Sequence, residues 1–223
     1  MISERAIRLD AADAASVGYA LVTTAAAVTG ARALVIKGSS ASFHRLRAER
    51  VSADIDVLVE PACVELMTQY LEGAGWKARP TSQLAETLVD HSVSFLHPDW
   101  PIDIDVHHRY PGLLVEATTA FEALWSRRTT MHVAGYEVPI PDRAGAILIG
   151  VLHNLRTTAE TSRHVTEYAN VVERVIPTLS EADRRDSVEL ARQVGALDSA
   201  RVFLLELGIP LPPATPSAGA RVW

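Results

Sequence analysis

The chain has 223 residues, of which 48% are hydrophobic and 22% are charged, a composition typical of a soluble globular protein with one core or one core and a helical annex. Its net charge of -6 argues against a broad basic surface for long nucleic acid, so DNA is not an expected partner. Cys63 is the single cysteine, which excludes an internal disulfide and favours a reducing, cytoplasmic location.

The N-terminal region predicts a long helix over residues 7–28, stopped by Gly30. Residues 14–31 carry no charged side chain, but they are mainly Ala, Thr and Val and therefore only weakly hydrophobic. We expect this helix to pack within a soluble protein rather than to span a membrane. No basic segment leads into an apolar core at the start of the sequence, so no signal peptide is expected.

Strands and short helices are predicted next. The expected strands lie at 33–36, 54–60 and 76–79, and the expected helices at 41–47 and from Pro61 to about residue 71. Residues 81–90 fit a loop with one helical turn. Two alternating runs, 91–97 and 102–107, flank a Pro-Asp-Trp-Pro break and predict a hairpin.

A helix at 113–125 and two short strands within 129–138 complete the first part of the chain. Beyond Pro141 only helices are predicted, at 142–157, 162–176, 181–194 and 199–207, with Ser180 and Asp183 as an N-terminal cap. The expected fold class is α/β (α+β), a small mixed β-sheet flanked by helices and followed by a helical bundle. The expected divisions are a core at 1–140, a helical domain at 141–209 and a flexible, proline-rich tail at 210–223.

Two of the predicted strands carry acidic residues at alternate positions. Asp54 and Asp56 project from one face of the first, and Asp103, Asp105 and His107 from one face of the second. If the two strands are neighbours in one sheet, three or four carboxylates meet, and they repel one another unless a cation lies between them. Mg²⁺ prefers such oxygen ligands and keeps open positions for phosphate oxygens, and two such ions serve phosphoryl transfer.

A small-residue turn, Gly38-Ser39-Ser40, precedes the first acidic strand. It allows close approach of the backbone and offers N–H groups and hydroxyls, which a triphosphate needs. No Gly-x-Gly-x-x-Gly sequence follows a strand, and no Walker-type Gly-Lys-Ser is present. The turn is therefore the predicted phosphate-binding element.

Taken in order, the Gly38-Ser39 turn, Asp54-Ile55-Asp56 and the later Asp105 resemble the signature of the polymerase-β-like nucleotidyltransferases. The closer resemblance is to a bacterial branch known as uncharacterised nucleotidyltransferases, through Lys37-Gly38, Arg50 and Ile104-Asp105-Val106-His107. It covers residues 34–108, and more loosely the helical half, where Leu152-His153 is similar to a helix histidine of that branch. The chain departs from minimal members, because Ala41 and Ser42 do not complete their Gly-Ser-x-Ala-x-Gly turn.

The resemblance implies an enzyme that transfers NMP from an NTP, such as ATP, to a hydroxyl or other nucleophile and releases pyrophosphate. The motifs do not specify the acceptor; the net negative charge favours a small molecule or a protein over long nucleic acid, and a tRNA end, as used by toxin-like relatives, is a further candidate. The implied cofactor is Mg²⁺, with two ions per site and Mn²⁺ as a substitute. The implied catalytic residues and metal ligands are Asp54, Asp56 and Asp105, and the implied nucleotide-binding residues are Lys37, Gly38, Ser39, Ser40, Arg50 and His107.

Several alternatives stay open at the level of sequence. Asp103 is a further ligand, a partner of a ligand or a surface residue. Arg50 clamps phosphate, orients a metal-ligating carboxylate, or pairs with an acidic neighbour such as Glu49 or Asp54. His107 hydrogen-bonds a carboxylate or the acceptor, and His153 is a core histidine or a site residue. Two other functions fit the same fold: a nucleotidylating toxin that acts on tRNA or protein, and a nucleotide-binding module without catalytic activity.

Overall fold

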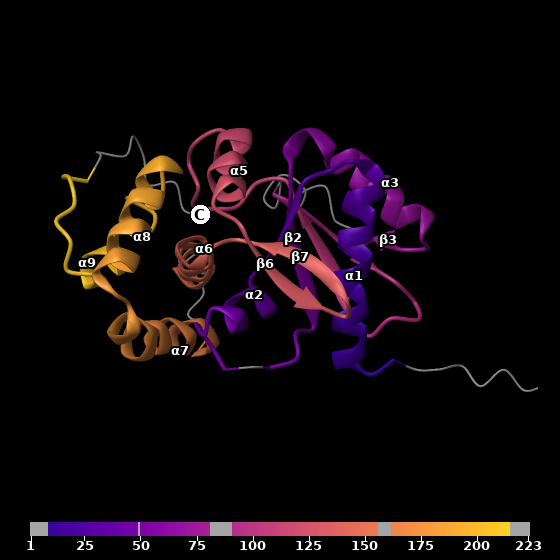
Figure 1. Cartoon of the computed structure of the whole chain (residues 1–223), viewed down its shortest axis with the longest axis horizontal. Coiled ribbons are helices and arrows are strands. Elements are labelled where there is room, and N and C mark those ends of the chain that lie inside the picture. Colours follow the sequence, from indigo (N-terminus) through magenta and orange to yellow (C-terminus); the bar gives the residue numbers. More distant parts are fainter. Residues whose placement is uncertain (1–8, 49, 81–90, 156–161, 215–223) are drawn as a thin grey trace, which may run out of the picture.

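A five-stranded mixed sheet forms the centre of the computed structural model, which describes residues 9–48, 50–80, 91–155 and 162–214 (Figure 1). The strand order is β1-β2-β5-β4-β3; β2 and β5 run parallel, and all other neighbours are antiparallel. The α/β fold and the predicted hairpin are confirmed. The strands are β1 Ala33–Ile36, β2 Asp54–Val59, β3 Lys77–Ala78, β4 Ser92–Leu96 and β5 Asp103–His107. The expectation for residues 81–90 falls outside the described residues.

Two helices cover one face of the sheet. Val57 and Val106 share a buried cluster with Tyr19 and Val22 of α1 (Ala11–Thr29) and Leu71 of α3 (Val64–Gly73), which follows a 3-10 turn at Pro61–Cys63. Among helices in the described residues, only α1 is long and apolar enough to cross a membrane, judged by length and composition alone. Its packing against the sheet agrees with the prediction of a packed helix.

The helical half of the chain packs on the opposite face. Leu34, Ile36 and Leu58 belong to a second buried cluster with residues of α6 (Arg143–Leu155), α8 (Glu181–Gln193) and α9 (Arg201–Glu206). Figure 1 shows these helices, orange to yellow, on the side of the molecule away from α1 and α3. Alternate residues of β2 point to opposite faces of the sheet, so Val57 enters the first cluster and Leu58 enters the second. The carboxylates of β2 are on the same face as Leu58 and therefore face the helical half. The division into domains at residue 140 stays a prediction.

A hairpin outside the main sheet connects the two halves. It consists of β6 (Thr129–Val133) and β7 (Tyr136–Ile140), which follow α5 (Ala117–Ser126). Ala134 and Gly135 form its turn with φ of 50° and 80°, and two positive φ values at the centre are the mark of the turns that match strand twist. The two predicted strands around Ala134-Gly135 are confirmed.

The helices α2, α5 and α7 differ from the sequence-based prediction, each for an identifiable reason. α2 spans Gly38–Phe43 rather than 41–47; it ends because Arg45 adopts φ 58° and Leu46 N–H returns to the carbonyl of Ala41. α5 starts late because the N–H groups of Leu114 and Val115 donate to the carbonyl of Val194 instead.

The helix expected at 162–176 is divided into α7 (Ser162–Asn170), a π-helical turn (Val171–Val175) and a 3-10 turn (Ile176–Thr178). Pro177 explains the irregularity, because proline lacks an N–H and its ring collides with the preceding turn. The next helix begins where it was predicted, with Ser180 and Asp183 in a reciprocal capping box. In the tail, the carbonyl of Pro212 accepts hydrogen bonds from Arg201, and residues 215–223 lie outside the described residues.

Gly112, in the connection between β5 and α5, provides a test of the packing between the two halves. Its φ is 95°, and an added Cβ would lie 2.6 Å from a methyl group of buried Leu152. We expect Gly112→Ala to lower the free energy of unfolding by about 1–3 kcal/mol, measured by urea denaturation. Gly150→Ala in α6 is the matched control. Apart from the adjoining residues and the local helix backbone, no described heavy atom lies within 4 Å of its added Cβ, so stability should stay equal or rise. Equal stability of the two variants would contradict the prediction.

Candidate active site

The register of β2 and β5 brings the acidic residues of the two strands together. In this parallel pair Asp54 is opposite Asp103, and Asp56 is opposite Asp105. The four carboxylates therefore lie on one face of two adjacent strands, although about fifty residues separate them in sequence. The sequence-based prediction of an acidic site required the two strands to be neighbours in one sheet, and they are.

Asp56 is at the centre of a buried group of charges. One of its oxygens, Oδ1, accepts hydrogen bonds from Lys37 Nζ at 2.5 Å and from His107 Nε2 at 2.9 Å. Only 5% of Asp56 and 2% of His107 are exposed. Burial alone would raise the pKa of Asp56, but the hydrogen bond from His107 and the charge of Lys37 together lower it. Asp56 is therefore held ionised and is neutralised by its neighbours.

Asp105 is in the opposite electrostatic situation. Burial raises the pKa of its carboxyl, and the adjacent Asp56 and Asp54 raise it further, while a hydrogen bond from Ser94 acts against the shift. The ligand atoms of Asp56, Asp105 and His107 lie within 4.8 Å of one another. Two carboxylates and an imidazole at this spacing fit a divalent cation, which would relieve the repulsion that Asp105 experiences. The metal ligation expected of Asp56 and Asp105 is thus compatible with the geometry.

The other acidic residues of the face are placed differently. Asp54 is half-buried, accepts a hydrogen bond from Ser52 Oγ at 3.1 Å and is not part of the group of three ligands. It lies one full pleat from Asp56, about 7 Å along the strand. Asp103 forms an ion pair with Arg79 at 2.6 Å, and half of the Arg79 side chain is exposed. Its role as a ligand has no support in this arrangement.

The predicted phosphate-binding turn lies where β1 ends. Lys37 has φ 56° and Gly38 φ 35°, and α2 begins at Gly38, so the turn residues form its first turn. Tyr19 OH lies 2.8 Å from Ser39 Oγ, and Ser40 is fully buried. The first N–H groups of a helix have no partner inside it and can receive an anion. Tyr19, on α1, carried no signal in the sequence because its contact with the turn is tertiary.

Arg50 does not contact the predicted turn or Asp54 in this structure. Its Nη2 donates to Glu167 Oε1 on α7 at 3.0 Å. Of the two acidic neighbours considered from sequence, Asp54 is not its partner among the described residues, and Glu49 lies outside them. Glu167 could not be identified from the sequence, since 117 residues separate the pair. His153 also lies beside α7, close to His164.

Comparisons with known proteins show the family of this chain and the solved structures that share its fold. The model of the family described as "Uncharacterised nucleotidyltransferase" matches residues 11–206. The solution structure of the antibiotic-resistance factor ANT(2'')-Ia is 14% identical, with a TM-score of 0.54 over 87% of this chain and 100% of that one. The crystal structure of ANT(2")-Ia in complex with adenylyl-2"-tobramycin is 12% identical, with a TM-score of 0.53 over 80% and 98%. No curated protein matches.

Proposed function

This chain belongs to the family of uncharacterised nucleotidyltransferases, and from that premise we propose that it transfers NMP from an NTP to a small-molecule or protein acceptor and uses Mg²⁺. The observation that carries the proposal is the juxtaposition of Asp56 and Asp105 on adjacent parallel strands, with Lys37 and His107 at the same oxygen of Asp56. A catalytically inactive binding module would have no need of such mutually repelling carboxylates.

The proposed reaction is an in-line displacement at the α-phosphorus of the nucleotide. The acceptor oxygen forms a new bond to phosphorus, the bond to the β,γ-pyrophosphate breaks, and pyrophosphate leaves with its bonding electrons. Asp105 accepts the proton of the acceptor hydroxyl, since its half-buried carboxylate lies on the face where the nucleotide is expected. Asp56 and Asp105, with Asp54 at the edge, would hold Mg²⁺, which supplies neutralisation of the charge that develops on the phosphates.

Residues around the carboxylates would orient the nucleotide. The N–H groups at Gly38 and Ser39, at the start of α2, are suited to the triphosphate, and Lys37 brings a positive charge to the same side. His107 orients Asp56 through its hydrogen bond and is too buried to approach an acceptor freely. Arg50, paired with Glu167, is better suited to fix the segment before β2 than to bind phosphate.

A structural neighbour indicates the first acceptor class to test. The structural neighbour ANT(2")-Ia was solved in complex with adenylyl-2"-tobramycin, and the match covers 98% of that chain. A small polyhydroxylated or amino-sugar acceptor is therefore the first class to test, with ATP as the first nucleotide. The net negative charge also favours a small acceptor over long nucleic acid.

The direct test is release of pyrophosphate from each labelled NTP in the presence of candidate acceptors. We expect a signal that requires Mg²⁺, disappears with EDTA and returns when Mg²⁺ or Mn²⁺ is added back, because the carboxylates repel phosphate without a cation. The acceptor panel should contain amino-sugars, tRNA and a protein extract, so that transfer to tRNA or protein would identify the toxin-like alternative. Mg²⁺-dependent binding of NTP without any transfer would instead indicate a binding module.

A further inference from the structure

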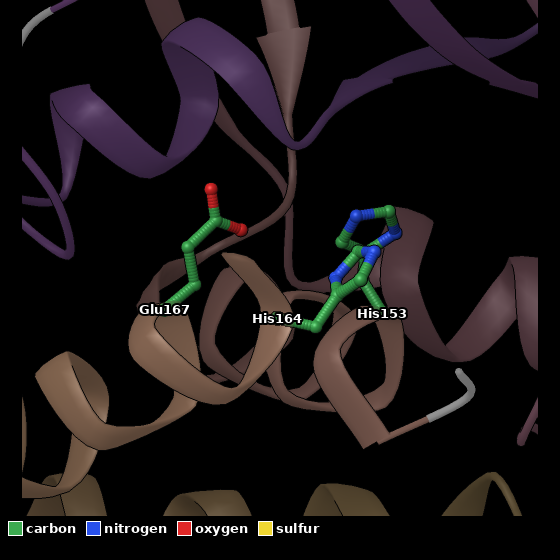
Figure 2. A group of neighbouring side chains, drawn as sticks. All are labelled: His153, His164 and Glu167. Carbon is green, nitrogen blue, oxygen red and sulfur yellow. The ribbon is translucent and has the colours of Figure 1, made fainter. Parts of the chain in front are cut away.

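A second group of metal-ligating side chains lies in the helical half and shares no residue with the acidic face. It consists of His153 on α6 and His164 and Glu167 on α7, and their ligand atoms lie within 4.8 Å of one another. Figure 2 shows the three side chains extending to the same side of the two helices, with the imidazole rings against each other. None of the three has a role in the proposed transfer.

Local structure explains why these residues meet. His164 and Glu167 are three positions apart on α7, so they occupy one face of that helix, and α7 packs beside α6. The two rings have centroids 5.1 Å apart and an interplanar angle of 66°. Nδ1 of His164 is buried and has no hydrogen-bond partner among the described residues. A buried polar atom without a partner is costly, and a bound metal would satisfy it.

The chemistry of this group differs from that of the acidic face. Two imidazoles and one carboxylate are typical ligands of Zn²⁺, which commonly has three protein ligands and a water in catalytic sites. The acidic face is richer in carboxylates, and carboxylate oxygens suit Mg²⁺. Ligand atoms in a tetrahedral zinc site are about 3.3 Å apart, given bonds of about 2.0–2.1 Å. Small rotations of the three half-buried side chains would close the present separation.

Arg50 completes the arrangement as a neighbour of the carboxylate. It donates to Oε1 of Glu167 at 3.0 Å, and a carboxylate that accepts one such bond still has acceptor capacity for a metal. Hydrogen bonds of this kind orient metal ligands in proteins. Because Arg50 lies four residues before Asp54, it connects this group to the segment that enters β2.

We propose that His153, His164 and Glu167 bind a divalent transition metal, with Zn²⁺ as the preferred ion. The metal joins α6 to α7 and, through Arg50, holds both to the segment before β2. This site is separate from the proposed Mg²⁺ site in position and ligand type, and it does not depend on the proposed transfer reaction. Binding of the metal should stabilise the folded chain, because the unfolded chain does not hold the three ligands together.

The test is titration of the metal-free full chain with Zn²⁺ by calorimetry, and with Co²⁺ as a spectroscopic probe. We expect roughly one equivalent to bind, visible Co²⁺ absorption of tetrahedral type, and a rise in melting temperature of roughly 5–10 °C at a hundredfold excess over the dissociation constant. His164→Asn should abolish all three signals. Glu167→Gln should weaken binding about tenfold to a hundredfold and keep the hydrogen bond from Arg50.

Asp105→Asn is the matched control, because it alters the acidic face and leaves this group intact. The proposal requires that Asp105→Asn retain Zn²⁺ binding and that His164→Asn lose it while its metal-free melting temperature stays near that of the unaltered chain. The reverse pattern would assign the ion to Asp56, Asp105 and His107 and overturn the proposal. So would the absence of stoichiometric binding, which would make the group an ordinary histidine pair beside an ion pair.

Discussion

Asp56→Asn is expected to abolish nucleotidyl transfer and also to destabilise the fold. The carboxylate is a proposed metal ligand, and loss of metal-assisted charge stabilisation costs several kcal/mol, so turnover should fall by about three orders of magnitude or more. The same change leaves the Lys37 ammonium, 17% exposed, without its counter-charge. Breaking a buried pair in this way should cost about 3 kcal/mol of unfolding free energy. Pyrophosphate release and urea denaturation measure the two effects.

The double variant Lys37→Met with Asp56→Asn separates these effects. It removes both charges, and replacement of a buried ion pair as a whole is often neutral for stability. We expect the double variant to recover most of the lost unfolding free energy and to remain inactive. With the single variant Lys37→Met measured as well, the double-mutant cycle gives the coupling between the two side chains. Recovery of activity together with stability would show that Asp56 acts through the fold rather than the chemistry.

Asp105→Asn is expected to abolish activity with the opposite effect on stability. Turnover should fall about a hundredfold to a thousandfold, because the proposed base and metal ligand is lost. Asp105 is half-buried and repelled by Asp56 and Asp54, whereas asparagine can still accept the hydrogen bond from Ser94. The metal-free variant should therefore be as stable as the unaltered chain or more stable by about 1 kcal/mol at neutral pH.

The pH dependence of that stability difference follows from the raised pKa of Asp105. Its folded-state pKa lies above the unfolded value, so the folded chain loses stability as the pH rises from the unfolded pKa through the folded pKa, and the loss is complete above the folded pKa. The advantage of Asp105→Asn should thus be present at neutral pH and vanish below about pH 4, where Asp105 is protonated in both states. Urea denaturation at several pH values without metal measures it. Retained turnover, or a clear loss of stability at neutral pH, would contradict the assignment.

Asp103→Asn is a control on the neighbouring position of the same strand face. Asp103 is paired with Arg79, and both side chains are substantially exposed, at 35% and 52%. An exposed ion pair of this kind contributes little to folding stability, so the free energy of unfolding should change by no more than about 0.5 kcal/mol. We expect activity within about threefold of the unaltered chain. A loss comparable with that of Asp105→Asn would show that four carboxylates take part.

Local sequence patterns predicted most elements of the fold, because period-two and helical patterns depend on near neighbours. The strand at 33–36, the hairpin around Pro98 and the capping box at Ser180 were found where expected, and the strand expected at 54–60 spans 54–59. The errors are at helix ends and in the helix expected at 162–176, which is divided before Pro177. α5 begins late because Leu114 and Val115 bond to the carbonyl of Val194, a partner about eighty residues away that no local pattern reveals.

The alternation of Asp54, Asp56, Asp103, Asp105 and His107 determined by itself that each strand has an acidic face. That much is fixed by the pleat of a strand and needs no partner. The sequence also placed Lys37 at the strand end before the turn, and the family resemblance that these residues carry is confirmed by the match over residues 11–206.

Only the tertiary structure decided which of these residues meet. The parallel register set Asp56 against Asp105, the end of β1 brought Lys37 onto Asp56, and the packing of α7 on α6 gathered His153, His164 and Glu167. Each contact joins residues far apart in the chain, so its existence depends on the pairing and packing of whole elements. The periodicity of a strand or helix determines the face from which a side chain projects, whereas the tertiary fold determines which distant residue it contacts.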